Sequence, residues 1–207
     1  MNLAFYITTT LPEWNLGERV EQFRREFIKA IPIAYQESEC CHGFVRHANQ
    51  IPWDDSKSEF DQDYGPWGRF MVPRWYNGSR GMSDRDLSQS FSVWSDLESV
   101  YAYAYEGTHG AFMRRSRARD FSEWRIIFMS VAWWIPATEV PTWQEAVERM
   151  HRLHDDGPSP EAFDARHPFD RTGRPETLNP VKLREIRAYN KVRLEQFYQS
   201  LGVQVTK

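Results

Sequence analysis

Two residues on one predicted helix have the chemistry of a proton-transfer site. The helix is predicted over residues 97 to about 117. At about 100° per residue, one face of this helix should meet the sheet, and Arg115 belongs to that face. His109 lies at the edge of the same face, beside Tyr105. A neutral imidazole relays protons near pH 7, and a guanidinium stabilises a carboxylate, enolate or phenolate oxygen. The sequence therefore predicts His109 and Arg115 as catalytic residues. The structural alternative is a histidine hydrogen-bonded at a helix edge and an arginine that caps backbone carbonyls.

Aromatic side chains are the second chemical feature, with nine Trp, nine Tyr and thirteen Phe making 15% of the chain. Large rings bring much apolar area together with polar tips that need partners, so they fill a core, line a pocket or build an interface. Trp133 and Trp134 are adjacent on a predicted strand and must point to opposite faces, so one of them is expected to line a cavity. Core packing or a dimer contact explains these rings equally well. The residues predicted to bind a ligand are Tyr6, Phe91, Trp94, Tyr105, Phe112, Trp133, Trp134 and Trp67.

Residues 49–88 form a long stretch rich in Asp, Gly, Pro, Ser and Trp, without sustained periodicity. A loop of this length in a compact domain tends to be a lid, a binding loop or a disordered insertion. Its aromatic residues are costly to leave in water, so we expect them to fold over a cavity mouth. Its carboxylates would supply an acid or base there, or simply be solvated. These residues are Trp53, Trp67, Trp75 and Tyr76, with Asp54, Asp55, Asp61 and Asp63.

His151 and His154 lie three residues apart on a predicted helix, a spacing compatible with one metal ion. No further ligand set accompanies them, so an exposed pair is the preferred interpretation and no metal is predicted. The chain also has no phosphate-cradling glycine loop, nucleophile elbow or dinucleotide fingerprint. Enzymes that use classical nucleotide cofactors are therefore disfavoured.

Hydrophobic periodicity predicts four strands and four helices. Pro32 is expected to end or kink the first helix. The order strand, helix, strand, strand, helix, strand is typical of the split-βαβ, ferredoxin-like antiparallel sheet. We expect one α+β domain over 1–207, with an insertion at 49–88 and a helical extension at 172–207. The predicted strands are 3–9, 43–47, 89–94 and 126–135, and the predicted helices are 18–36, 97–117, 142–155 and 180–201.

Several short motifs follow one another along the middle of the chain. They are FSVWSDLESV at 91–100, TH at 108–109, FMRR at 112–115, VAWWIPA at 131–137, PT at 141–142 and GPSPEAF at 157–163. Together they resemble the DUF3291 family of uncharacterised proteins, which is similar to the antibiotic-biosynthesis-monooxygenase type of dimeric α/β barrel. The resemblance implies a ferredoxin-like protomer whose sheet pairs with another in a homodimer, and a mostly apolar cavity between sheet and helices. It implies no known reaction. Two departures are the length of 49–88 and the triplet RDF at 119–121, where a Trp-Phe pair is expected.

The net charge of −3, with 41% hydrophobic and 27% charged residues, is ordinary for a globular protein. No stretch approaches the roughly 20 apolar residues of a spanning helix, and the first residues lack the pattern of a secretory signal. Adjacent Cys40 and Cys41 suit neither a staple between distant segments nor a zinc site. We therefore expect a cytoplasmic protein without a membrane partner. Only the basic run at 114–119 would favour a nucleic-acid partner, and none is predicted.

The leading hypothesis is a cofactor-independent enzyme, a cyclase, isomerase or oxygenase, that acts on a hydrophobic small molecule of secondary-metabolite type in an aromatic-lined cavity. Shape and a few polar groups would do most of the work in such a site. A non-catalytic carrier or sensor of an apolar molecule is the alternative. A third hypothesis is a haem-binding protein with His109 as axial ligand.

Overall fold

The computed structural model describes residues 1–10, 18–48, 62–76, 87–117 and 128–202. The chain divides into two compact units, which are described separately. The sheet unit comprises Met1–Leu11, Arg46–Val93 and Ile126–Thr177, and the helical unit comprises Pro12–Val45, Trp94–Arg125 and Leu178–Lys207. The predictions made for Trp53, Asp54, Asp55 and Asp61, and for the triplet at 119–121, lie outside the described residues.

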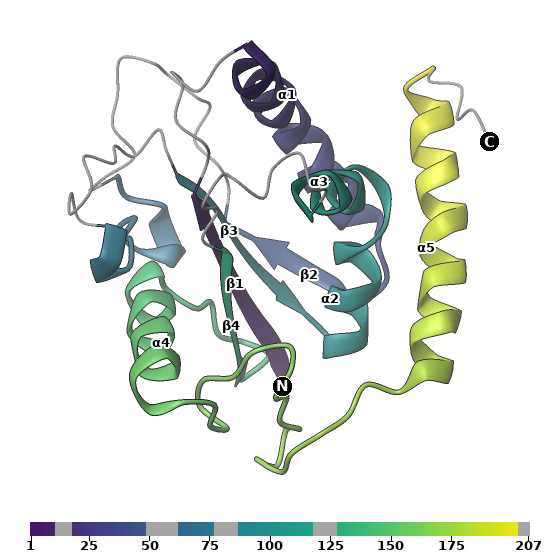
Figure 1. The fold of residues 1–207 in the computed structure, drawn as a ribbon. Coiled ribbons are helices and arrows are strands. Elements are labelled where there is room, and N and C mark those ends of the chain that lie inside the picture. Colours follow the sequence, from purple (N-terminus) through teal and green to yellow (C-terminus); the bar gives the residue numbers. More distant parts are fainter. Residues whose placement is uncertain (11–17, 49–61, 77–86, 118–127, 203–207) are drawn as a thin grey trace. The chain divides into compact units, whose positions relative to one another are not determined.

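Four strands form one antiparallel sheet in the order β2-β3-β1-β4 (Figure 1). The β1 and β4 strands run antiparallel, with Asn2 opposite Ile135 and Thr9 opposite Phe128. The chain order of strands and helices, with β1 and β3 in the centre of the sheet, is that of an α+β ferredoxin-like fold. This fold class was predicted from the hydrophobic pattern and is confirmed. The strands are β1 (Asn2–Thr10), β2 (Phe44–His47), β3 (Leu87–Trp94) and β4 (Phe128–Ile135).

One face of the sheet is covered within the sheet unit by helix α4 (Trp143–Asp156) and by residues 62–76, which contain the short helices η1 (Gly65–Trp67) and η2 (Arg74–Tyr76). Helix α4 begins with a capping box, as Thr142 accepts the Glu145 N–H and the Glu145 carboxylate accepts the Thr142 N–H. Every second residue of the strands faces this cover, because side chains alternate along a strand. These residues are Ala4, Tyr6, Phe91, Val93, Val131 and Trp133.

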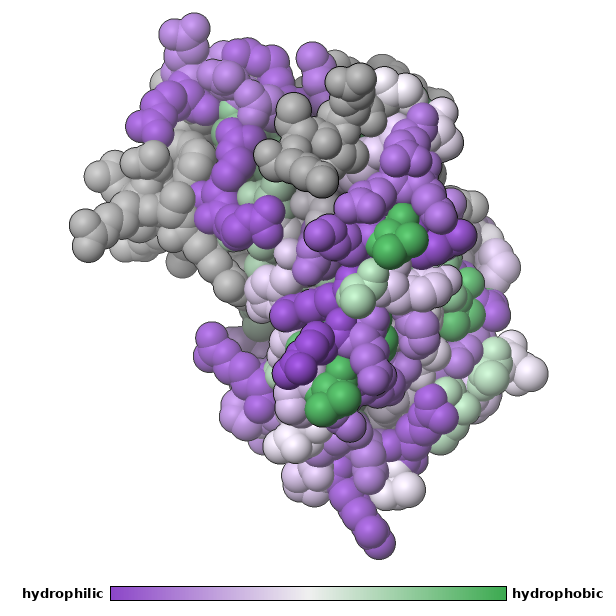
Figure 2. Space-filling model, turned by 90° about the vertical axis from the view of Figure 1, so that its right-hand side faces the viewer, coloured by the Kyte–Doolittle hydropathy of each residue, from purple (hydrophilic) through white to green (hydrophobic). Residues whose placement is uncertain are grey.

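The helical unit contains four helices in the part of the chain that is described. Helix α3 packs against α1, and α5 packs against α1 and α2 (Figure 1). The face drawn in Figure 2 is mostly hydrophilic with separate hydrophobic positions. Val181, Tyr189 and Val192 of α5 are exposed. The helices are α1 (Glu18–Cys40), α2 (Leu97–Ala104), α3 (Gly107–Arg117) and α5 (Pro180–Ser200).

Two helix boundaries differ from the prediction. Pro32 was expected to end or kink α1; it does not end the helix, which continues to Cys40. A proline inside a helix removes a single N–H donor, and α1 continues past it. The single helix expected over 97–117 is instead α2 and α3, separated by a corner at Gly107, where φ is +53°.

Within the described residues, none of the helices combines the length and the apolar composition that a membrane crossing requires.

Candidate functional site

His109 lies partly buried on α3, just after the corner with α2. Its Nδ1 lies 2.8 Å from the Ala104 carbonyl oxygen, the last residue of α2. A carbonyl only accepts hydrogen bonds, so Nδ1 carries the proton and Nε2 of the neutral ring carries the lone pair. Among the described residues, Nε2 has no hydrogen-bond partner. The local fold therefore presents the basic nitrogen of a fixed tautomer.

The protonation state of His109 follows from its surroundings. Burial lowers the pKa of His109 below 6.5, and the Ala104 carbonyl and the Glu37 carboxylate only partly oppose this effect. The ring is therefore neutral at pH 7 and able to accept a proton. It packs on the Tyr103 ring, with centroids 5.2 Å apart, and Tyr103 in turn stacks on Trp94 at 5.3 Å. Rings from β3, α2 and α3 thus form a continuous stack that ends at the imidazole.

Arg115 is placed differently from the sequence hypothesis. Its guanidinium donates to Glu26 of α1 at 2.7 Å and lies over the rings of Phe23 and Phe112. Both charged side chains are exposed to solvent, at 44% for Arg115 and 40% for Glu26. In the described part of the chain, no contact joins Arg115 to His109. A role for Arg115 in stabilising a substrate oxygen would require the guanidinium to leave Glu26.

A buried carboxylate that the sequence analysis did not identify lies beside the corner of α2 and α3. Glu37 of α1 is 0% exposed and accepts from the Thr108 N–H at 2.9 Å and from the Thr108 hydroxyl at 2.6 Å. It also accepts from the Tyr198 phenol of α5. A carboxylate removed from water needs such donors. No sequence pattern marks Glu37, because it stands in a polar run, QESE at 36–39.

Replacing Gly107 with Ala is expected to lower the free energy of unfolding by about 1–3 kcal/mol. The backbone at Gly107 has φ +53°, which side chains disfavour, and a Cβ there would lie 2.5 Å from Oε2 of Glu37. Urea unfolding of the variant measures the loss. Gly157→Ala is the matched control: Gly157 also has positive φ, but a Cβ there meets nothing within 4 Å. Equal losses in the two variants would contradict close packing by Glu37.

The remaining predicted ligand-binding residues of the helical unit pack among aromatic neighbours. Trp94 is buried and meets Phe44 edge to face as well as Tyr103. Phe112 contacts Phe23 and Phe27 between α3 and α1. Tyr105 is partly exposed and its ring lies 6.1 Å from that of Tyr101. Of these residues, Trp94 alone belongs to the stack that reaches His109.

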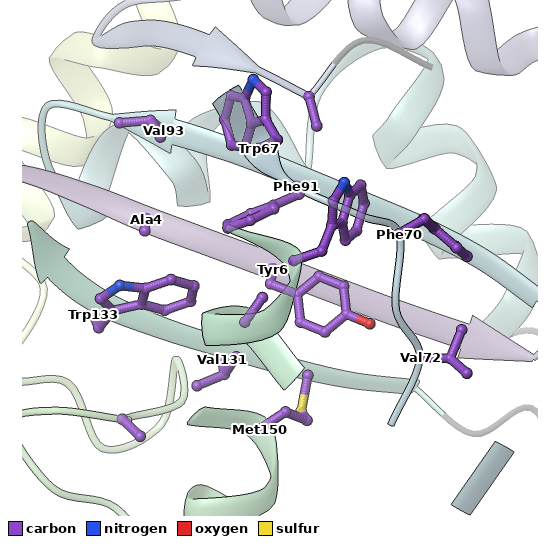
Figure 3. Packing of buried hydrophobic residues seen from close by; sticks show 14 of the residues in the cluster. Ala4, Tyr6, Trp67, Phe70, Val72, Phe91, Val93, Val131, Trp133 and Met150 are labelled. Carbon is purple, nitrogen blue, oxygen red and sulfur yellow. The ribbon is translucent and has the colours of Figure 1, made fainter. Parts of the chain in front are cut away.

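The other predicted ligand-binding residues lie in the sheet unit, and most of them contact one another (Figure 3). Phe91 is central and fully buried, with ring centroids between 4.9 and 5.9 Å from those of four neighbours. Trp134 lies on the opposite face from Trp133, as predicted, where its indole N–H donates to the Phe169 carbonyl at 2.7 Å. The predicted site residues therefore fall into a sheet group and a helical group. The neighbours of Phe91 are Tyr6, Trp67, Trp133 and Trp143.

Buried polar atoms without hydrogen bonds lie on the face of the sheet that α4 and residues 62–76 cover. The Tyr6 phenol donates to the Gln89 amide oxygen, and burial raises the pKa of Tyr6 well above 10. In the described residues, other polar side-chain atoms on this face are buried without a partner, although folded proteins contain few such atoms. They are donors, so a ligand with oxygen acceptors would complement them. These atoms are Gln89 Nε2, Trp133 Nε1 and Trp143 Nε1.

His151 and His154 of α4 hold an aromatic ring of the 62–76 segment. Their rings lie 5.2 and 4.9 Å from that of Trp75. His151 Nε2 also accepts the Arg74 N–H at 3.0 Å. No cluster of three or more metal-ligating side chains exists in the described ranges. The pair thus fastens η2 to α4.

Stability is expected to fall with pH below about 6.5 because of His151. Burial, and then the charge of Arg74, lower the pKa of His151 in the folded state below 6.5. The unfolded chain therefore takes up the proton first, so the contribution is complete above pH 6.5 and is lost as the pH falls through the folded-state pKa. Urea unfolding at pH 7, 6 and 5 should show a weaker pH dependence for His151→Gln than for the wild type. Parallel curves would refute this assignment, and the exposed His167→Gln serves as control.

The family model described as Domain of unknown function (DUF3291) matches residues 19–179. No curated protein and no solved structure matches the chain. The matched range includes His109, Glu37 and strands β3 and β4, but not β1 with Tyr6, and it ends one residue before α5 begins at Pro180.

Proposed function

The chain belongs to the DUF3291 family, and from that premise we propose that it is a cofactor-independent enzyme in which His109 accepts a proton from a hydrophobic small molecule. The observation that supports this proposal is the hydrogen bond from Nδ1 of His109 to the Ala104 carbonyl. It leaves the lone pair on Nε2. General bases work best when their pKa lies near the operating pH, and a neutral imidazole meets that requirement at pH 7.

The chemistry that this group supports is a proton shift. Nε2 takes a proton from a carbon beside a carbonyl, or from a hydroxyl, and the imidazolium returns it at another position. The product is an isomer or a cyclised form of the substrate, and no electrons are gained or lost. Oxygenation at the same site would in addition consume O2 as co-substrate. The aromatic stack through Tyr103 and Trp94 favours an apolar, unsaturated substrate of secondary-metabolite type.

The test compares wild type with His109→Gln on a mixture of small apolar metabolites in heavy water. Mass spectrometry detects compounds that change into isomers or gain deuterium only with the wild type. Deuterium enters because the proton on Nε2 exchanges with solvent before it is returned. If both proteins give the same products and the same deuterium content, His109 is not the base.

A non-catalytic carrier or sensor is the alternative, and the unpartnered indole N–H groups of Trp133 and Trp143 favour it. A carrier needs apolar surface with a few donors but no proton acceptor. A ligand recovered unchanged, and bound equally well by His109→Gln, would support the carrier. Haem ligation by His109 stays a prediction, for which a Soret band after addition of haem is the test. Pairing of two copies through the sheet also stays a prediction, and light scattering decides it.

A further inference from the structure

The C-terminal helix α5 contributes directly to the surroundings of His109. Its Tyr198 donates to the Glu37 carboxylate, which accepts both donors of Thr108, the residue before His109. Helix α5 lies beyond the residues that match the family, 19–179. The corner that carries the imidazole is therefore completed by an element that the family pattern does not include.

We propose that Glu37 and Tyr198 are positioning residues that hold the His109 imidazole in place at the corner between α2 and α3. This inference rests on the proposed function of His109. Glu37 acts through Thr108 and touches no substrate, so it is not itself a catalytic residue. Its carboxylate fixes the first turn of α3 from one side, and the bond from His109 to the Ala104 carbonyl fixes the ring from the other.

The corner has little freedom to move. Gly107 approaches Glu37 so closely that a Cβ would lie 2.5 Å from Oε2 and 3.0 Å from Cδ. Gly107 also has a positive φ, and the Gly110 N–H closes the first turn of α3 by donating to the Glu106 carbonyl at 2.8 Å. The Glu37 carboxylate is therefore packed against the backbone that carries His109 and is hydrogen-bonded to it through Thr108.

Helix α5 is attached to the helical unit along its length, so Tyr198 is not a loose contact. At its start, Lys182 pairs with Glu98 at 3.0 Å and with Asp96 at 3.3 Å. In its middle, Asn190 is 0% exposed and accepts the His42 N–H at 2.8 Å. Near its end, Tyr198 reaches Glu37. These three attachments allow α5 to hold the connection between α2 and α3 in place.

The charge of Glu37 also affects the protonation of His109. It favours the imidazolium that forms when Nε2 accepts a proton, whereas burial disfavours that form. Burial also raises the pKa of the Tyr198 phenol and of the Cys41 thiol, each to about 12, so both stay neutral near pH 7. The titratable groups that interact with the Glu37 carboxylate, besides His109, are Cys40, Cys41, Tyr103 and Tyr198.

NMR spectroscopy of the His109 ring tests this inference without a substrate. Glu37→Gln keeps an oxygen acceptor for Thr108 but removes the charge, so the titration midpoint of His109 should move to lower pH. Tyr198→Phe removes only the phenol donor. It should shift the His109 ring-proton resonances away from the positions that the Tyr103 ring current imposes. The readout is independent of turnover, so failure of the proposed enzyme activity would leave the result interpretable.

Matched controls separate positioning from general effects on the helices. Glu39→Gln removes an exposed carboxylate from the same helix as Glu37, and Tyr189→Phe removes an exposed phenol from the same helix as Tyr198. Both controls should leave the His109 signals unchanged. If Glu37→Gln does not fold, Tyr198→Phe alone decides. Wild-type titration and ring shifts in folded Tyr198→Phe would overturn the proposal.

Discussion

Replacing His109 with Gln is expected to lower kcat by about 10²–10⁴-fold, the usual contribution of a positioned general base. The amide has no lone pair of comparable basicity to offer in place of Nε2, while it keeps a donor for the Ala104 carbonyl. Substrate binding should change much less, so the loss appears in kcat rather than in KM. Steady-state rates with the substrate identified by mass spectrometry give this comparison directly.

The pH profile adds a second readout of the same prediction. Because burial lowers the pKa of His109 below 6.5, the wild-type kcat/KM should be constant near neutral pH and decline only at lower pH. The decline reflects protonation of Nε2, and it should vanish from the residual rate of His109→Gln. The exposed His167 provides the control substitution, also to Gln, which should retain wild-type rates. A full wild-type rate in His109→Gln would remove the imidazole from the mechanism.

The fold could be predicted because its signals are local. The alternation in β3 and the continuous apolar run of β4 identified both strands, and the helix predicted over 142–155 corresponds to α4. The corner at Gly107 could not be predicted in this way. Its geometry depends on a carboxylate that comes from α1, about 70 positions earlier in the chain. A helical pattern continues through the glycine, and only the tertiary contact shows that the helix is broken there.

The candidate site shows the same division between local and distant information. The residue type and position of His109 were enough to select it, but not to identify Ala104 as its partner. Alternation correctly placed Trp133 and Trp134 on opposite faces, yet it gave no information on which rings touch. Glu37 was missed because a glutamate on a helix is usually solvated.

Replacing Phe91 with Ala is expected to lower the free energy of unfolding by about 3–5 kcal/mol, a large part of the roughly 5–15 kcal/mol that holds a domain folded. The Phe91 ring is 0% exposed and meets Trp143 of α4 and Trp67 of η1, which cover this face of the sheet. Removing it leaves a cavity among rigid aromatic groups that cannot collapse easily. Urea unfolding followed by near-UV circular dichroism measures the loss.

The same substitution separates a core role for Phe91 from the ligand-binding role that its sequence suggested. A residue that lines an open site contributes mainly to ligand affinity, so its truncation leaves stability within about 1 kcal/mol. A core residue contributes mainly to stability, so its truncation lowers the free energy of unfolding by more than that.

Phe169→Ala is the matched control, since Phe169 is partly exposed in the same unit and its ring meets that of Phe163 at 5.9 Å. Because the Phe91 ring meets those of Tyr6, Trp67, Trp133 and Trp143, Phe91→Ala should destabilise the protein several times more than the control. Equal losses would mean that the aromatic face of the sheet is loose enough to admit another molecule.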